Sequence, residues 1–226
     1  TTMLYTSGTT GRPKGVHRET NGVMSKYATE QSQRMAALAG LQAGRDVTLV
    51  TGPLYHAAPL AFALGLPLAY GTTVVLMDGW DAAETLRLME QHRVTHTHMV
   101  PTMFHRLLSL PEDVRTRHDL SSLRLIWHGA APCPVPVKQS LIEWLGPIVW
   151  EYYGATEGLT TVVSSADWLA HPGTVGRPED GIIVIRDDDG ELAPANVPGT
   201  VYIKAPDESE ARFHYFGDQA KTASTY

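Results

Sequence analysis

Strand-like and helix-like segments alternate along most of the chain, and this alternation limits the possible fold more than any other feature. Short runs rich in apolar and β-branched residues occupy 47–51, 72–77, 94–100, 123–127 and 148–152. Segments with helical spacing or capping signals occupy 19–41, 61–69, 135–145 and the stretches that follow Asp81 and Pro101. Such alternation predicts an α/β fold, a largely parallel sheet flanked by helices. The segment 61–69 is apolar on every side and is therefore expected to be buried.

The pattern changes near residue 172. Two strand-like runs, 182–185 and 201–203, follow, and Asp187–Gly190 between them is typical of a hairpin turn. We therefore expect an α/β part over residues 1–171 and a small antiparallel β-rich part over residues 172–226. The acidic run at 187–189 lacks the full spacing of an EF-hand, so a solvated hairpin tip is favoured over a calcium site.

Composition excludes several classes of protein. Of the 226 residues 43% are hydrophobic and 19% charged, as in globular proteins with a real core. The net charge of −6 argues against a general nucleic-acid-binding protein. Cys133 is the single cysteine, which excludes a disulfide framework and favours a reducing, cytoplasmic location. The longest apolar-rich stretch, 57–69, is broken by prolines and glycine, so no membrane span is expected, and the oligomeric state is left open.

The stretch TSGTTGRPKG at Thr6–Gly15 combines hydroxyl residues, glycines and a lysine directly after the strand-like Met3–Tyr5. Glycines let the backbone approach a ligand closely, and hydroxyls, backbone N–H groups and a lysine can bind phosphate oxygens. The spacing differs from a Walker A loop, whose second glycine would fall on Pro13, and no Rossmann fingerprint is present. A polyphosphate cradle is therefore predicted, with a surface turn as the alternative.

A second informative stretch is Tyr153–Glu157. The tyrosine ring can stack on a nucleobase, the Thr156 hydroxyl can bond a phosphate, and Glu157 offers a hard oxygen to Mg²⁺. On its own, the stretch also fits a strand end followed by a capped helix. Ligands of parallel sheets sit at the carboxyl ends of strands, so we expect this turn, the phosphate loop, His56 and the turn at Gly129 to meet at one edge.

Five motifs together resemble the adenylate-forming superfamily of acyl- and aryl-CoA synthetases, luciferases and peptide-synthetase adenylation domains. They are TSGTTGRPKGV (Thr6–Val16), PLYHAAP (Pro53–Pro59), HGAAPCP (His128–Pro134), YYGATEG (Tyr152–Gly158) and GTVGRP (Gly173–Pro178). The resemblance covers essentially the whole chain and is strongest to bacterial fatty-acyl-type CoA ligases, which points to fatty acid metabolism. It implies a ligase that joins a carboxylic acid to ATP with Mg²⁺, forming an acyl-adenylate, and then passes the acyl group to coenzyme A.

The resemblance also implies roles for single residues. A phosphate cradle is implied for Thr6, Ser7, Gly8, Thr9, Thr10, Gly11 and Lys14, and an adenine slot between Gly129, Ala130 and Ala131 on one side and Tyr153 on the other. Thr156 would bond the α-phosphate, Glu157 would hold Mg²⁺, and His56 would gate the carboxylate site, so Lys14, Thr156, Glu157 and His56 are the implied catalytic residues. Gly154 belongs to the implied nucleotide site and, with Trp127, to the acyl pocket. For His56, a packed turn histidine remains the alternative.

The chain also departs from the family pattern. The Y-x-x-T-G-D aspartate that binds ribose in relatives is absent, and so is the C-terminal domain with its catalytic lysine. We therefore expect a central fragment of a longer enzyme that binds ATP weakly and turns over negligibly by itself. Two rival hypotheses remain: a non-catalytic nucleotide-binding module, and an amino-acid adenylation domain, for which no clear pocket aspartate is visible.

Overall fold

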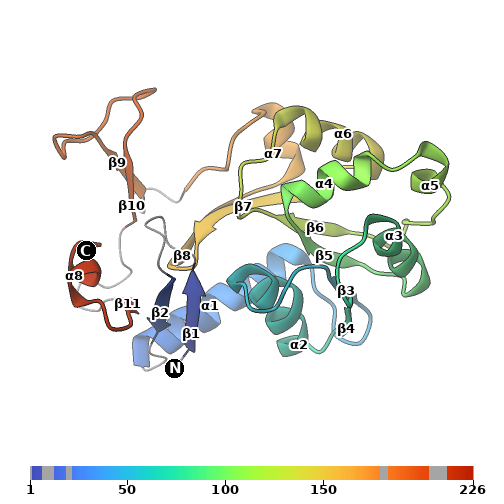
Figure 1. Ribbon diagram of the computed structural model, residues 1–226, viewed down its shortest axis with the longest axis horizontal. Coiled ribbons are helices and arrows are strands. Elements are labelled where there is room, and N and C mark those ends of the chain that lie inside the picture. The colour runs from blue at the N-terminus through green and yellow to red at the C-terminus, as the bar shows by residue number, and fades with distance from the viewer. Residues whose placement is uncertain (1, 7–12, 19–21, 179–182, 204–212, 226) are drawn as a thin grey trace.

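A six-stranded sheet covered by helices on both faces forms the centre of the protein in a computed structural model (Figure 1). The structure describes residues 2–6, 13–18, 22–178, 183–203 and 213–225. Two smaller antiparallel sheets, one of three strands and one of two, accompany the central sheet.

The helices and strands follow one another in this order. They are β1 (Thr2–Thr6), β2 (Lys14–Arg18), α1 (Gly22–Ala39), β3 (Val47–Val50), the π-helix η1 (Pro59–Gly65), α2 (Leu66–Ala69), β4 (Thr73–Leu76), α3 (Ala82–Gln91), β5 (His96–Met99), α4 (Pro101–Leu108), α5 (Glu112–Thr116), β6 (Leu125–His128), α6 (Val135–Leu145), β7 (Val149–Ala155), β8 (Gly158–Val163), α7 (Ser165–Ala170), β9 (Ile183–Arg186), β10 (Thr200–Ile203), β11 (His214–Tyr215) and α8 (Gln219–Ala223).

The central sheet has the strand order β4-β3-β5-β6-β7-β8, and β8 alone runs antiparallel to its neighbour. This confirms the predicted α/β fold with a largely parallel sheet. Side chains alternate between the two faces, as a strand requires. Ile126 packs in the core cluster that includes residues of α3, α4, α6 and α7, whereas Trp127 packs with residues of α1 and η1. Both faces are covered, which explains the continuous apolar runs read from the sequence.

Several helices begin or end at residues whose local chemistry predicted the boundary. Asp81 caps α3, and its carboxylate accepts a hydrogen bond of 2.8 Å from the Glu84 amide. Pro101 is the first residue of α4, where its missing N–H costs nothing. Gly146 ends α6 in the left-handed region, with φ +85°, which is a conformation that favours glycine.

The prediction of a buried helix over 61–69 is wrong in two respects. The segment divides into the π-helix η1 and the short α2, and only Pro59, Ala63 and Pro67 are buried within them. Leu68 is 57% exposed. The segment packs with one side on β3 and β5, so its other side remains in contact with solvent.

The two small sheets contain elements that the sequence predicted and elements that it did not. The strands β9 and β10 pair antiparallel, as expected for the region after residue 172. The strands β1 and β2 form a hairpin in which Thr6 lies opposite Lys14, and β11 joins the other edge of β2. The strands β2 and β11 of the three-stranded sheet, and β8 of the central sheet, were not expected, and the division of the chain at residue 171 stays a prediction.

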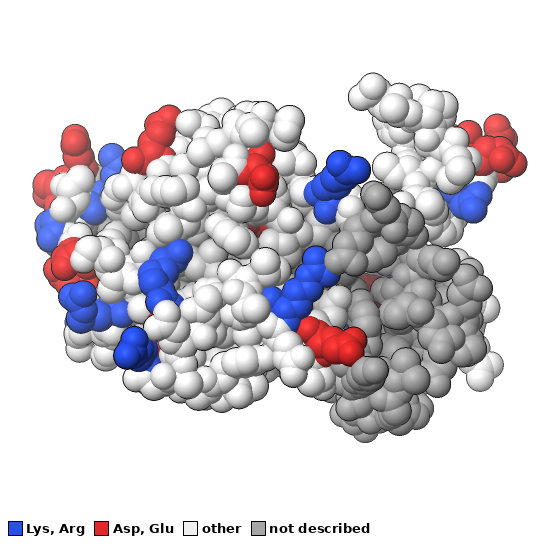
Figure 2. All heavy atoms as spheres, turned by 180° about the vertical axis from the view of Figure 1, so that it is seen from behind, with Lys and Arg blue, Asp and Glu red and all other residues white. Residues whose placement is uncertain are grey.

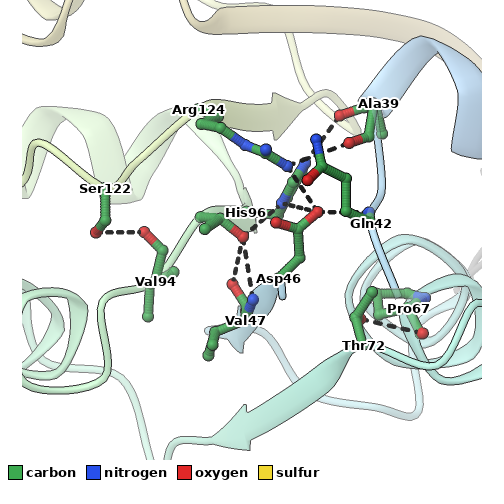
Figure 3. A network of polar contacts seen from close by, with 12 residues as sticks. Ala39, Gln42, Asp46, Val47, Pro67, Thr72, Val94, His96, Ser122 and Arg124 are labelled. Carbon is green, nitrogen blue, oxygen red and sulfur yellow. Dashed lines mark hydrogen bonds and ion pairs between the residues drawn. The ribbon is translucent and has the colours of Figure 1, made fainter. Parts of the chain in front are cut away.

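A buried carboxylate ties the end of α1 to the edge where the parallel strands begin (Figure 3). Asp46 is 2% exposed and accepts hydrogen bonds from the Gln42 amide at 2.7 Å and from Arg124 at 2.6 Å. Nearby, Nε2 of His96 lies 2.8 Å from the carbonyl oxygen of Ala39, and burial lowers the pKa of this histidine. These contacts join the helix to β3, β5 and β6.

Candidate functional site

Two predicted site residues, Lys14 and Glu157, meet at Tyr215. Tyr215 lies on β11, opposite Val16 of β2, and is 7% exposed. Its hydroxyl donates a hydrogen bond of 2.7 Å to Oε1 of Glu157. The Lys14 ammonium lies 5.4 Å from the centre of its ring, within the range of a cation–π interaction. The structure therefore places a cation and a carboxylate around one aromatic ring, from three separate parts of the sequence.

Thr156 and Glu157 form the two-residue connection between β7 and β8. Ala155 pairs with Gly158, so only these two residues lie in the turn. The Arg18 guanidinium donates a hydrogen bond to the carbonyl oxygen of Thr156, which links the turn to the end of β2. The alternative of a strand followed by a capped helix is wrong here, because an antiparallel strand follows.

The turn after β6 approaches β7 very closely. A Cβ atom on Gly129 would lie 2.6 Å from both Cζ and the carbonyl oxygen of Tyr152, so this position accepts only glycine without rearrangement. Ala130 has φ +66°, which is uncommon for a residue with a side chain. Ala130 and Ala131 are exposed, and Tyr153 on β7 is 41% exposed. The predicted walls of the adenine slot therefore lie near the carboxyl ends of neighbouring strands, and each has exposed residues.

Tyr152 packs in a buried aromatic cluster. Nε2 of His98 lies 2.8 Å from the Tyr152 hydroxyl, and the ring centre of Phe62 is 4.7 Å from that of Tyr152. Burial lowers the pKa of His98 to about 4 and raises the pKa of Tyr152 well above its usual value. A neutral histidine therefore fixes the tyrosine against which Gly129 packs. Trp127, at 2% exposure, belongs to the same cluster, and its predicted part in an acyl pocket stays a prediction.

The structure places His56 apart from these contacts. His56 is exposed, and its ring centre lies 4.7 Å from that of Tyr55 in the turn before η1. Among the described residues no contact joins His56 to Glu157 or Lys14, so its role as a gate stays a prediction. Within the same described ranges no group of His, Cys, Asp and Glu side chains is arranged to hold a metal by itself. His96 and His98, which lie two residues apart on β5, each contact a different protein group: the carbonyl oxygen of Ala39 and the hydroxyl of Tyr152.

Of the predicted phosphate cradle, the structure describes only the two ends. Thr6 and Lys14 face one another across the β1–β2 hairpin. Ser7, Gly8, Thr9, Thr10 and Gly11 lie outside the described residues, so their predicted contacts with phosphate stay predictions. Unlike the other expected site segments, this loop connects two strands of the three-stranded sheet and does not belong to the central one.

A cavity of about 370 Å³ lies elsewhere, where β6 and β7 begin. Its walls include Arg115, His118, Leu123, Trp144 and Ile148. These residues come from the opposite edge of the sheet to the turns described above, and none of them is a predicted site residue. The cavity therefore adds nothing to the candidate site.

Sequence reasoning missed Tyr215, Arg18 and a buried ion pair between Lys138 and Glu151. One signal for the ion pair was present. Lys138 stands three and four positions before Leu141 and Ile142, so it shares the buried face of α6. A lysine on an apolar face indicates a buried partner, because lysine is almost never fully buried unpaired.

Charge is mixed on the surface. Figure 2 shows Lys and Arg side chains interspersed with Asp and Glu on the face opposite to that of Figure 1. In the ranges that the structure describes, no helix is long and apolar enough to cross a membrane.

Comparisons with known proteins place the chain in a family. Residues 1–209 match the family described as AMP-binding enzyme. The chain is 38% identical over 179 residues to a 2-succinylbenzoate–CoA ligase from Bacillus pumilus, which covers 78% of this chain and 34% of that protein. It is 29% identical over 207 residues to a long-chain-fatty-acid–CoA ligase from Bacillus subtilis, covering 90% of this chain and 36% of that one.

A solved structure shows the same fold. It is the O-succinylbenzoate coenzyme A synthetase from Bacillus subtilis in complex with AMP, with a TM-score of 0.79 and 29% identity over 99% of this chain and 44% of that one. The chain spans about 40% of the length of the curated relatives that it matches over nearly its whole length.

Proposed function

This chain belongs to the AMP-binding enzyme family, and from that premise we propose that it carries much of the nucleotide site of an ATP-dependent acid–thiol ligase. The reaction joins a carboxylic acid to ATP, releases pyrophosphate, and passes the acyl group of the acyl-adenylate to coenzyme A. The relatives are CoA ligases, which supports the ligase class. By itself the chain is expected to bind ATP weakly and to turn over negligibly.

One observation carries this proposal: Lys14 and Glu157 meet at Tyr215 beside the turn that contains Thr156. A carboxylate that attacks the α-phosphorus is repelled by the phosphate charges. The Lys14 ammonium would lower that repulsion, and Thr156 would orient the α-phosphate by a hydrogen bond. Because the two reactants are held in place and charge is neutralised, the reaction needs no nucleophilic side chain.

The residues present fit a magnesium ion. Glu157 offers a hard carboxylate oxygen, and its other oxygen, Oε1, is held by Tyr215. Mg²⁺ is usually bound by one or two carboxylates together with substrate phosphates, so a single protein ligand suffices. When bound, the ion would supply further neutralisation of phosphate charge. Glu157 would hold it together with substrate phosphates and water.

The nucleobase would lie between the Gly129–Ala131 turn and the ring of Tyr153. The close packing of Gly129 on Tyr152 fixes the first wall, and the exposed ring of Tyr153 offers a stacking surface for the second. The main chain at Gly154, where the pairing of β7 with β8 is irregular, would lie next to this slot.

The acid is proposed to be uncharged apart from its carboxylate. Trp127 and Phe62 pack together near the carboxyl ends of the central strands, and both are apolar. A fatty acyl group is the finer proposal. The relatives act on acids as different as 2-succinylbenzoate and long-chain fatty acids, so aromatic acids belong in the same test. An amino-acid substrate remains the alternative. In either case, His56 would stand at the entrance of the site for the carboxylate.

The direct test is thermal melting of the chain with and without Mg·ATP, in the wild type and in Glu157→Ala. We expect Mg·ATP to raise the melting temperature of the wild type and to leave that of the variant unchanged. The exposed Glu191, on the β9 hairpin, provides a matched control, and Glu191→Ala is expected to respond like the wild type. A wild type without any response, or a Glu157→Ala chain with a full response, would contradict the proposal. Because the chain by itself is expected to turn over negligibly, pyrophosphate release by the longer parent enzyme, measured with aliphatic, aromatic and amino acids, then separates the substrate classes.

A further inference from the structure

A fully buried lysine lies directly behind the proposed nucleobase slot. Lys138 on α6 is 0% exposed, and its Nζ lies 2.7 Å from Oε2 of Glu151 on β7. The ammonium also lies 4.9 Å from the ring centre of Trp168 on α7. Burial lowers the pKa of Lys138, and the hydrogen bond with Glu151 opposes that change. The lysine is thus held by one carboxylate and one aromatic face.

The ion pair lies at the point where three elements of the site converge. Glu151 is the direct cross-strand neighbour of His128, whose Nε2 is 3.4 Å from Oε2 of the same carboxylate. His128 immediately precedes Gly129, and Glu151 immediately precedes Tyr152 and Tyr153. The pair therefore joins α6, which follows the Gly129–Ala131 turn, to the strand that presents Tyr153.

The histidine in this cluster takes no part as a charge. Burial and the Lys138 ammonium lower the pKa of His128 to about 2, so the ring is neutral. Its two ring nitrogens have no hydrogen-bond partner within the part of the chain that the structure describes. The electrostatic link between the helix and the strand is consequently the Lys138–Glu151 pair.

Stability alone is a weak reason for such a pair. Removing two charges from water is costly, and replacing a buried ion pair by apolar residues of similar volume is often neutral or stabilising. A pair in this place does, however, fix a distance: the Gly129–Ala131 turn is attached to α6, and Tyr153 is attached to β7. Gly129 also packs so closely on Tyr152 that a Cβ atom would not fit between them.

We propose that Lys138 is a positioning residue that, through Glu151, sets the separation of the two walls of the nucleobase slot. This inference rests on the proposed function of the same site. It concerns recognition of the base and not of the phosphates, whose proposed partners Lys14, Thr156 and Glu157 lie at Tyr215 and in the β7–β8 turn. Loss of the pair should therefore weaken adenine-containing ligands selectively.

The experiment compares AMP with inorganic pyrophosphate as ligands of the 226-residue chain, by isothermal titration calorimetry with Mg²⁺ present. The variant is Lys138→Met with Glu151→Gln, which removes both charges and leaves neither unpaired. We expect its melting temperature to stay close to that of the wild type. Its affinity for AMP should fall about tenfold, or about 1.4 kcal/mol, while its affinity for pyrophosphate stays unchanged.

A matched control is Arg87→Met, which breaks the exposed Glu84–Arg87 pair on α3 and should alter neither affinity. A folded double variant with wild-type affinity for AMP would overturn the inference, and so would an equal loss for both ligands.

If the double variant does not fold, Lys138→Arg with Glu151→Asp keeps both charges but shifts their meeting point towards β7. It should show the same selective loss, and unchanged AMP affinity would overturn the inference. A wild type that binds neither ligand would contradict the proposed function, and this inference with it.

Discussion

The hydroxyl of Tyr215 donates a hydrogen bond of 2.7 Å to Oε1 of Glu157, a residue 58 positions earlier in the chain. The bond joins β11 of the three-stranded sheet to the turn at the end of the central sheet. It also orients the carboxylate that we propose as the magnesium ligand. Tyr215 thus connects two sheets at the site where the phosphates would bind.

Tyr215→Phe should weaken metal binding while the ring and its packing remain. Groups that orient a metal ligand typically change metal affinity about 10-fold or more when they are removed. We expect a loss of about that size in Mn²⁺ affinity, measured by electron paramagnetic resonance with ATP present. Tyr202→Phe removes an exposed hydroxyl on β10 and should leave the affinity unchanged. Equal affinities in Tyr215→Phe and the wild type would refute the orienting role.

Gly129→Ala should destabilise the protein, because the new Cβ would lie 2.6 Å from Tyr152. Forcing extra volume into a packed site typically costs about 1–3 kcal/mol, which urea denaturation would detect. The neighbouring Ala130→Gly is a contrasting control, since glycine relieves the strain of φ +66°. We expect Ala130→Gly to cost less than Gly129→Ala, and the reverse order would argue against the close approach.

Stability should fall as the pH falls below about 6.5. Burial lowers the pKa of His98 to about 4 from its ordinary value of 6.5, so the unfolded chain binds more protons between these two values. The free energy of unfolding therefore decreases from about pH 6.5 towards about pH 4, by up to about 1.4 kcal/mol per pH unit for each such histidine. His128, with a pKa of about 2, acts in the same direction.

Urea denaturation between pH 5 and pH 7.5 measures this slope. His98→Gln keeps a polar partner for the Tyr152 hydroxyl but does not titrate in this range, so the slope should become smaller. His105 is exposed on α4, and His105→Gln should keep the wild-type slope. An identical slope in His98→Gln and the wild type would show that the difference in bound protons between the folded and unfolded chain does not come from His98.

Asp46→Asn should destabilise the junction of α1 with the central sheet. The carboxylate accepts hydrogen bonds from the Gln42 amide and from Arg124, and an amide of the same size loses the charge and one acceptor. Hydrogen bonds to charged groups contribute about 1.5–3 kcal/mol each, so we expect a loss within that range in urea denaturation. Glu84→Gln, in an ion pair on the surface of α3, should have a much smaller effect. A change at Asp46 no larger than that control would be inconsistent with its structural role.

The sequence predicted the central sheet well because its signals are local. Asp81, Pro101 and Gly146 mark helix ends by their own local chemistry, and most strands of the sheet are rich in apolar or β-branched residues because both faces are covered. The apolar segment at 61–69 misled the prediction, since its composition does not reveal that only one of its sides packs on the sheet.

The predicted site was read from motifs, and the structure adds what motifs do not contain. The contact of Lys14 and Glu157 with Tyr215 depends on pairing between β2 and β11, two strands nearly 200 residues apart in the chain. No local pattern around Tyr215 indicates its partner. The Lys138–Glu151 pair likewise becomes visible only when α6 packs beside β7.

The connection of β7 to β8 contains only Thr156 and Glu157. An additional residue here must be taken up by a longer loop or a bulge, because a shift of β8 by one position would turn its side chains to the opposite face of the sheet. An insertion is therefore more constrained at this point than in most surface turns, which usually tolerate one. The length of the proposed phosphate-binding turn and the packing of the sheet edge are therefore linked, and we expect this turn to accept substitutions more readily than gain or loss of residues.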